Sequence, residues 1–202
     1  MSRNATRIAV IGGIAVGKSS IVHTLSKKLN DYYLIEEDVL KNLFLPEFYG
    51  DMKTWAFHSR ISTLAMITEN SLGMTKDGQA TKIIMDRCVD ELITFAKMHY
   101  DKGNMSEKEF SVYSSLYSSI VKLAPPIDLF IYCKCLPEIS LERITKRNRS
   151  FEQNIDLDYI SLLNSYYDEW LSSIDSARVK TINTNSDIDI ESIQKFILDY
   201  GL

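Results

Sequence analysis

The sequence has few of the features that mark membrane proteins or disulfide-stabilised proteins. No apolar run approaches the roughly 18 residues that a bilayer-spanning helix needs, and no signal or transit peptide stands out. Its 202 residues include only three cysteines, Cys88, Cys133 and Cys135. An odd count, without a second pair at metal-ligand spacing, argues against a disulfide framework or a structural zinc site. We therefore expect buried free thiols in a cytoplasmic chain.

Basic charge and histidine are also sparse. The formal net charge is −4, which argues against a long nucleic acid as partner, because such binding usually needs a basic face. His23, His58 and His99 are scattered without metal spacing, so we interpret them as surface or packing residues. No repeat or break in composition divides the chain. We expect residues 1–202 to form one domain, with neither a nucleic-acid polymer nor a membrane as partner.

Short β-rich runs alternate with stretches of helical spacing along the chain. Each run is almost continuously apolar, which is typical of strands covered on both faces. Strands that alternate with helices favour a parallel sheet with right-handed crossovers. The sequence therefore predicts an α/β fold, a five-stranded parallel sheet with helices on both faces, in three layers (α/β/α). The predicted strands are 7–11, 32–36, 82–86, 129–133 and 179–183, and the predicted helices include 19–29, 55–69, 89–100, 139–146 and 190–200.

One motif in this pattern predicts a phosphate-binding site. Residues 12–19, GGIAVGKS, match G-x-x-x-x-G-K-[ST] in full, between the first predicted strand and helix. Gly12 and Gly17 let backbone N–H groups turn inward, and the helix start adds its positive dipole end. Lys18 supplies charge to the β- and γ-phosphates, and the Ser19 hydroxyl can ligate Mg²⁺. The predicted triphosphate-binding residues are Gly12, Gly13, Ile14, Ala15, Val16, Gly17, Lys18, Ser19 and Ser20.

Acidic residues follow the second and third predicted strands. In open α/β sheets, ligands bind at the carboxyl ends of the strands. Glu37 is our candidate for a base that takes a proton from a hydroxyl as a phosphoryl group arrives. Asp86 is our candidate for a metal ion or its water shell, with Arg87 nearby to orient the reacting groups. Acids after a strand can also cap the next helix, so this interpretation depends on the neighbouring phosphate loop.

A basic segment follows the fourth predicted strand. Arg143, Lys146 and Arg147 recur at helical spacing, and Arg149 lies just beyond. Arginines of the same chain can stabilise the charge that develops on a transferred phosphoryl group. The polar residues that follow suit a lid, at about 143–155, that closes over the phosphates. A solvated basic helix face is the alternative.

These motifs resemble those of deoxyribonucleoside kinases of the deoxycytidine, deoxyguanosine and mitochondrial thymidine kinase type, over nearly the whole chain. Residues 36–39, EEDV, look like the family's acidic motif, and its catalytic base falls on Glu37. Residues 86–88, DRC, and 143–153, RITKRNRSFEQ, are similar to its second motif and its lid. The resemblance implies a P-loop nucleoside/nucleotide kinase-like fold and a homodimer. It also implies transfer of the γ-phosphoryl group of ATP, with Mg²⁺, to the 5′-hydroxyl of a deoxyribonucleoside in salvage of DNA precursors.

The resemblance assigns residues to the nucleoside. Tyr49 and Glu152 match positions that hold the sugar 3′-hydroxyl, and Trp55 and Phe57 match aromatic residues of the nucleoside pocket. Arg60 falls where the family usually has a glutamine that reads the base edge. Because arginine only donates hydrogen bonds, Arg60 would favour bases that present acceptors, such as O6 and N7 of guanine or O4 of thymine.

Other assignments concern the phosphates and the donor. Arg147 and Arg149 match lid arginines on the phosphates, and Arg143 matches an arginine beside the donor base. Asp187, after the fifth predicted strand, would also lie near the donor base. The catalytic set is then Glu37, Arg87, Lys18, Arg147 and Arg149.

Further residues depart from the family pattern. Asp38 replaces the usual proline after the base, and Cys88 replaces a serine. The chain is also one residue short after this second motif. Either Asp90 or Glu91 could therefore hold the acidic position with which some members select amino-bearing bases.

Two other functions stay open at this point. A nucleoside monophosphate kinase, such as a thymidylate kinase, shares the loop and topology. Its acceptor is already an anion, so it needs no base but needs a further cation, which could be Arg60. A nucleotide-gated switch that reads guanine usually carries an Asn-Lys-x-Asp type segment, which the sequence lacks.

Overall fold

A parallel five-stranded sheet forms the centre of the fold, in the order β2-β3-β1-β4-β5. The computed structural model describes residues 5–72 and 81–202. Every neighbouring pair of strands is parallel, as the alternation of strands and helices predicts. The elements are β1 (Thr6–Ile11), α1 (Lys18–Lys28), β2 (Tyr33–Ile35), η1 (Val39–Lys41), α2 (Leu45–Gly50), α3 (Met52–Leu72), β3 (Lys82–Asp86), α4 (Leu92–Asp101), α5 (Glu107–Leu123), β4 (Leu129–Lys134), α6 (Pro137–Arg147), η2 (Ser150–Glu152), α7 (Leu157–Leu171), η3 (Ser176–Arg178), β5 (Val179–Asn183) and α8 (Ile190–Asp199).

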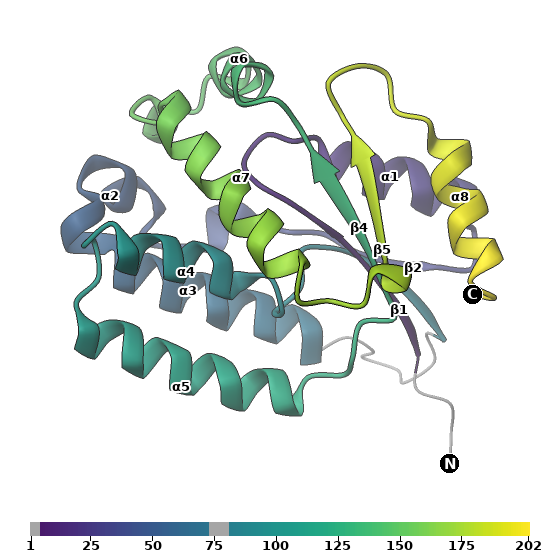
Figure 1. Ribbon diagram of the computed structural model, residues 1–202, viewed down its shortest axis with the longest axis horizontal. Coiled ribbons are helices and arrows are strands. Elements are labelled where there is room, and N and C mark those ends of the chain that lie inside the picture. The colour runs from purple at the N-terminus through teal and green to yellow at the C-terminus, as the bar shows by residue number, and fades with distance from the viewer. Residues whose placement is uncertain (1–4, 73–80) are drawn as a thin grey trace.

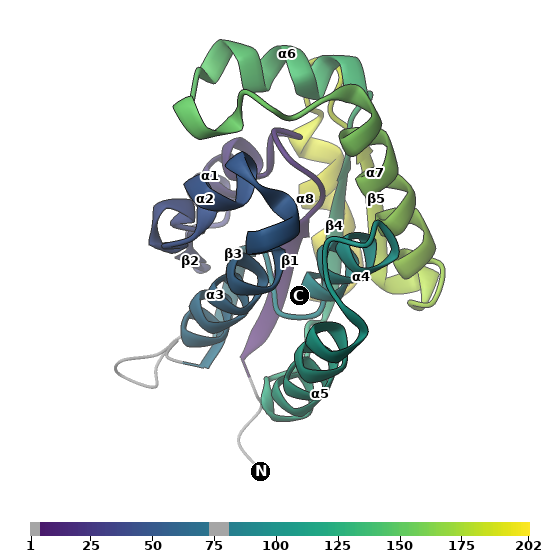
Figure 2. The same ribbon diagram turned by 90° about the vertical axis from the view of Figure 1, so that its left-hand side faces the viewer.

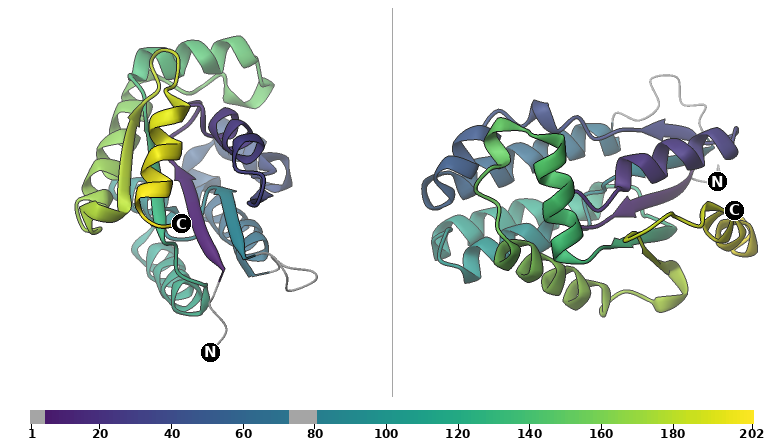
Figure 3. Two further views of the ribbon diagram at one scale, coloured as in Figure 1. Left: turned by 90° about the vertical axis from the view of Figure 1, so that its right-hand side faces the viewer. Right: turned by 90° about the horizontal axis from the view of Figure 1, so that it is seen from above.

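Helices cover both faces of the sheet, which explains the continuous apolar character of its strands. Along β1, Ile8 and Val10 pack into the core under α1 and α8, whereas Ala9 and Ile11 pack into the core on the opposite face. Helices α3, α4, α5 and α7 gather on that opposite face, and α1 and α8 lie together on the other (Figures 1 and 3). The three-layer α/β/α prediction is confirmed.

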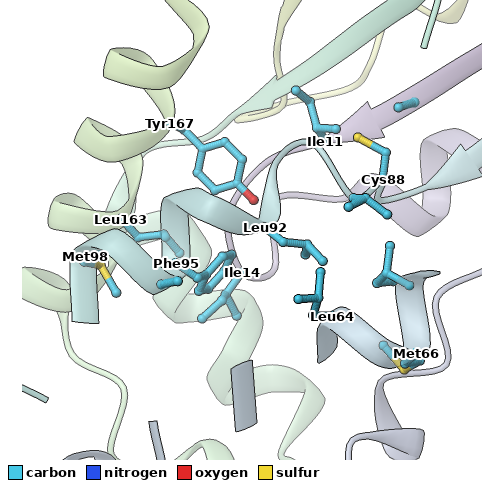
Figure 4. Close-up of a cluster of buried hydrophobic side chains, with 14 of the residues drawn as sticks. Ile11, Ile14, Leu64, Met66, Cys88, Leu92, Phe95, Met98, Leu163 and Tyr167 are labelled. Carbon is cyan, nitrogen blue, oxygen red and sulfur yellow. The ribbon is translucent and has the colours of Figure 1, made fainter. Parts of the chain in front are cut away.

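The core on the side of α3, α4, α5 and α7 also contributes residues to the cavity described below. Figure 4 shows Leu64, Phe95, Leu163 and Tyr167 among its buried side chains. Tyr167 is fully buried, yet its hydroxyl reaches Arg87 and Glu91. Polar residues near the strand ends are therefore packed against an apolar scaffold that limits their movement.

Some element boundaries follow from local sequence signals, and others do not. Ser106 and Glu109 form a capping box at the start of α5, with the Ser106 hydroxyl accepting from the Glu109 N–H at 3.3 Å. Helix α4 begins at Leu92 rather than at residue 89, because residues 89–91 form a bend and turn. All three cysteines are buried free thiols, as expected. Within the described residues, no helix has the length and apolar character needed to cross a membrane.

Candidate active site

A cavity of about 480 Å³ lies where the phosphate loop, α3 and the residues around α6 meet. Helix α6 and the segment after it lie above this end of the sheet (Figure 2). The strands are parallel, so the loops that follow β1, β2, β3 and β4 meet at one edge. The lining residues are Ile14, Ala15, Val16, Gly17, Lys18, Ser19, Ser20, Glu37, Val39, Asn42, Leu45, Tyr49, Arg60, Thr63, Met66, Arg87, Leu92, Phe95, Arg143, Arg147, Arg149, Glu152 and Ile188.

The phosphate loop needs glycine at its first position. Gly12 has φ +138, and a Cβ there would lie 2.7 Å from the Cys133 carbonyl oxygen. The Lys18 ammonium is buried and donates to the carbonyl oxygens of Gly12 and Gly13, at 3.1 and 2.6 Å. Burial lowers the pKa of Lys18, and the carboxylate of Asp86 opposes that shift. The loop is therefore curled around its own lysine, which can exchange these carbonyls for phosphate oxygens.

A Gly12→Ala substitution is expected to lower the free energy of unfolding by more than about 1 kcal/mol and to weaken ATP binding, because alanine is strained at positive φ. The control is Gly50→Ala, where an added Cβ meets nothing within 4 Å. Thermal unfolding and ATP titration of both variants measure the effect. Equal stability and ATP affinity in the two variants would contradict this view of the loop.

Ser19 and Asp86 form a pair of oxygen ligands at the base of the loop. The Ser19 hydroxyl donates to Asp86 Oδ2 at 2.6 Å, whereas Asp86 Oδ1 is buried with no hydrogen-bond partner among the described residues. Burial raises the pKa of Asp86, and Lys18 opposes that shift. A hard cation beside this oxygen would satisfy it, so the pair fits Mg²⁺. The described residues hold no cluster of three or more acidic, histidine or cysteine ligands, and Mg²⁺ at phosphate sites commonly uses only one or two carboxylates.

Glu37 and Arg87 lie together in the cavity. Arg87 Nε donates to Glu37 Oε1 at 2.9 Å, and the two side chains are 9% and 16% exposed. Burial by itself would lower the pKa of Arg87. The negative charges of Glu37 and Glu91 outweigh this effect, so the pKa of Arg87 is raised. Arg87 has φ +72, a conformation rare outside glycine, and its N–H donates to the Val10 carbonyl at 3.1 Å. Strained backbone of this kind is concentrated at functional sites, where the surrounding structure holds it in place.

The neighbour of the predicted base has a different role. Asp38 caps the short η1 helix, and its carboxylate accepts from the Leu40 N–H at 3.3 Å. The helix-cap alternative for acids after a strand therefore applies to Asp38, whereas Glu37 faces the cavity.

Glu91 connects Arg87 to the phosphate loop. Neither Asp90 nor Glu91 lines the cavity, so the structure places neither at a base-reading position. The Glu91 carboxylate is fully buried, accepts from the Gly12 N–H at 3.2 Å and from the Tyr167 hydroxyl, and lies 3.4 Å from Arg87 Nη1. Burial raises the pKa of Glu91, and Arg87 opposes that shift. The sequence signal was the acidic pair Asp90 and Glu91, which follows the motif at residues 86–88. The directions in which these two side chains point depend on the turn before α4.

The predicted lid residues converge on one glutamate. Arg147 donates through Nε and Nη2 to the two carboxylate oxygens of Glu152, both at 2.6 Å, and Arg149 Nη1 lies 3.4 Å from the same group. Glu152 is only 3% exposed. Arg143 instead donates to the Thr184 carbonyl at 2.5 Å and to the Ala15 carbonyl at 3.5 Å. It therefore connects the phosphate loop to the segment after β5.

The structure brings Tyr49 and Arg60 to the cavity, but not Trp55, Phe57 or Asp187. Trp55 stacks on Phe44 at 5.7 Å, and Phe57 lies on α3 one turn before Arg60. Asp187 is exposed. Aromatic type alone could not show which turn of α3 borders the cavity. Several lining residues went unrecognised in the sequence because they look like ordinary helix or core positions: Val39, Asn42, Leu45, Thr63, Met66, Leu92 and Phe95.

The fold and this cavity define a P-loop phosphotransferase. The sequence model of the family described as "Deoxynucleoside kinase" matches residues 8–199. A deoxyadenosine kinase from Dictyostelium discoideum is 32% identical over 199 residues, covering 97% of this chain and 79% of that protein. A deoxyadenosine/deoxycytidine kinase from Bacillus subtilis is 33% identical over 175 residues, covering 85% of this chain and 79% of that protein.

Solved structures agree with the sequence relatives. Deoxyadenosine kinase from M. mycoides with bound dCTP has a TM-score of 0.83 and 27% identity, covering 96% of this chain and 100% of that chain. The chain belongs to the deoxynucleoside kinase family. It is an ATP-dependent enzyme that transfers a phosphoryl group from a nucleoside triphosphate to a deoxynucleoside. The family resemblance in the sequence is confirmed.

Proposed function

We propose that Glu37 is the general base that takes the proton of the 5′-hydroxyl as the γ-phosphoryl group of ATP arrives. The observation that carries this proposal is that Glu37 and Lys18 line one cavity. Arg87 holds Glu37 at 2.9 Å, so one carboxylate oxygen is fixed and the group is already oriented. A positioned base and a positioned acceptor remove much of the entropic barrier to the reaction.

On the donor side, the phosphate loop and Lys18 bind the β- and γ-phosphates, with Arg147 and Arg149 closing over them. Arg143 borders the donor nucleotide, which is supported by its contact with Ala15 of the loop. Ser19 and Asp86 would hold Mg²⁺, which when bound neutralises charge on the β- and γ-phosphates. The unpartnered Oδ1 of buried Asp86 supports this assignment.

On the acceptor side, Tyr49 and Glu152 hold the sugar 3′-hydroxyl. The pairing of Glu152 with Arg147 joins sugar recognition to the lid, because the same carboxylate serves both. Burial raises the pKa of Tyr49 to about 12, so its hydroxyl stays protonated at neutral pH and can donate to the sugar. Residues 1–202 then act as one kinase domain, with a lid at about 143–155.

We further propose a cytoplasmic homodimer that serves salvage of DNA precursors. The family resemblance supports the assembly.

Transfer of label from γ-labelled ATP separates this function from the alternatives. Purified enzyme is supplied with deoxynucleosides, with deoxynucleoside monophosphates, or with no acceptor. The expected labelled products are deoxynucleoside 5′-monophosphates, with activity lost in excess EDTA and restored by Mg²⁺. Transfer only to monophosphates would identify a monophosphate kinase, and acceptor-independent release of phosphate would indicate a nucleotide-gated switch.

A further inference from the structure

Arg60 is a buried cation at the cavity wall that has no acidic partner among the described residues. It is 6% exposed, and its guanidinium carbon lies 4.9 and 5.0 Å from the ring centroids of Phe48 and Phe95. Nη2 donates to the Ser59 hydroxyl at 3.0 Å, whereas Nε is buried with no partner in the part of the chain that the structure describes. Across residues 5–72 and 81–202 it forms no ion pair. The two rings hold the guanidinium in place and leave donors unused.

The carboxylates that line the cavity already serve other arginines. Glu37 pairs with Arg87 at 2.9 Å, and Glu152 pairs with Arg147 at 2.6 Å. Neither carboxylate can turn to Arg60 without leaving its partner. The charge of Arg60, which lines the cavity, is therefore available to a ligand.

Neutral polar groups near Arg60 are used within the protein. Asn42 Nδ2 donates to the hydroxyls of Ser59 and Thr63, both at 3.0 Å, and Asn42 Oδ1 accepts from the Phe44 N–H at 3.1 Å. The Thr63 hydroxyl in turn donates to the Ser59 carbonyl at 3.0 Å. Arg60 therefore keeps the largest share of unused donors among these groups, since a guanidinium has five N–H donors and only its bond to Ser59 is formed among the described residues.

The position of Arg60 assigns it to the base. The triphosphate occupies the loop, and the proposed reacting hydroxyl lies at Glu37, so the rest of the cavity remains for the sugar and base. Leu45, Met66, Leu92 and Phe95 give the cavity apolar walls, and Phe95 lies directly against Arg60, so the faces of a flat heterocycle fit there. A base that enters there meets Arg60 with its polar edge.

We infer that this end of the cavity selects a 6-oxopurine, as in deoxyguanosine or deoxyinosine, whose O6 and N7 accept from Arg60. Two adjacent acceptors match the fork of a guanidinium. Adenine and cytosine instead point an amino group at it, and thymine offers one acceptor, O4. This inference rests on the proposed function, and it separates the chain from the relatives above that are named for deoxyadenosine.

The wild-type enzyme gives the first test, through kcat/KM for deoxyguanosine, deoxyinosine, deoxyadenosine and 7-deazadeoxyguanosine. Both 6-oxopurines are expected to exceed deoxyadenosine by at least about tenfold, the discrimination typical of a bidentate pair. Removal of N7 in the deaza compound is expected to lower kcat/KM by about fivefold or more. Deoxyinosine lacks the 2-amino group, so its retention as a good substrate assigns the preference to the O6 and N7 edge.

The second test replaces the guanidinium of Arg60 with the amide of glutamine. In Arg60→Gln the side chain can pair with N6 and N7 of adenine, so the deoxyadenosine to deoxyguanosine ratio is expected to rise at least about tenfold. Lys53→Gln, at an exposed position on the same helix, is the control and should leave the ratio unchanged. If Arg60→Gln does not fold, the 7-deaza comparison in the wild type still decides.

Two results overturn the inference while leaving the proposed function intact. One is a wild-type enzyme that phosphorylates deoxyadenosine as well as deoxyguanosine, and the other is a folded Arg60→Gln variant with an unchanged ratio. Transfer of label only to monophosphates would overturn both, because Arg60 would then bind an acceptor phosphate.

Discussion

The Glu37→Gln variant is expected to lose at least about 100-fold in kcat, the usual contribution of a positioned general base. Glutamine is nearly isosteric, and its amide oxygen can still accept from Arg87, so the arginine should stay in place. The proton of the 5′-hydroxyl would have no acceptor, while the phosphate loop would be unchanged. Steady-state kinetics should therefore show a fall in kcat with little change in KM for ATP.

The chain provides a matched control one residue away. Glu36 is exposed and lies 3.2 Å from His23, outside the cavity, so Glu36→Gln should keep wild-type kinetics. A Glu37→Gln variant that retained more than a third of kcat would contradict the assignment of the base. It would favour an acceptor that is already an anion.

The Lys18→Met variant is expected to lose about 100- to 1,000-fold in kcat/KM for ATP, as for removal of one charged group that stabilises a transition state. Methionine keeps much of the buried stem but removes the ammonium that donates to Gly12 and Gly13. The loop would then have no side-chain cation of its own directed at the β- and γ-phosphates.

Lys28→Met tests whether any lysine of α1 has this effect. Lys28 is exposed in the last turn of the helix and should be dispensable. Isothermal titration with ATP and initial rates distinguish weaker binding from slower transfer. Nearly wild-type kcat/KM for ATP in a folded Lys18→Met variant would show that the phosphates bind elsewhere.

The parts of the site that follow from a local motif or from the ends of parallel strands could be predicted from the sequence. The phosphate loop is a local motif whose backbone geometry depends on Gly12 and Gly17, so its residues identify its position. Asp86 could be placed beside Ser19 because the ends of parallel strands meet at one edge, although the two residues are far apart in the chain.

The parts that depend on the direction of a side chain could not be predicted in this way. Glu91 turns toward Gly12 because α4 begins only at Leu92, and helical spacing alone placed that start earlier. Trp55 and Phe57 have the residue type of a nucleoside pocket, yet their turns of α3 lie outside the cavity. Which turn borders the cavity is set by the packing of α2, α3 and η2, a tertiary property.

A crystal structure of the enzyme with ADP and a bound deoxynucleoside tests the central claim most directly. We expect a carboxylate oxygen of Glu37 within about 2.6–3.2 Å of the 5′-oxygen, directly or through one water, on the side of the sugar that faces Lys18. A 5′-hydroxyl that points away from the phosphate loop, with Glu37 contacting only Arg87, would contradict the account.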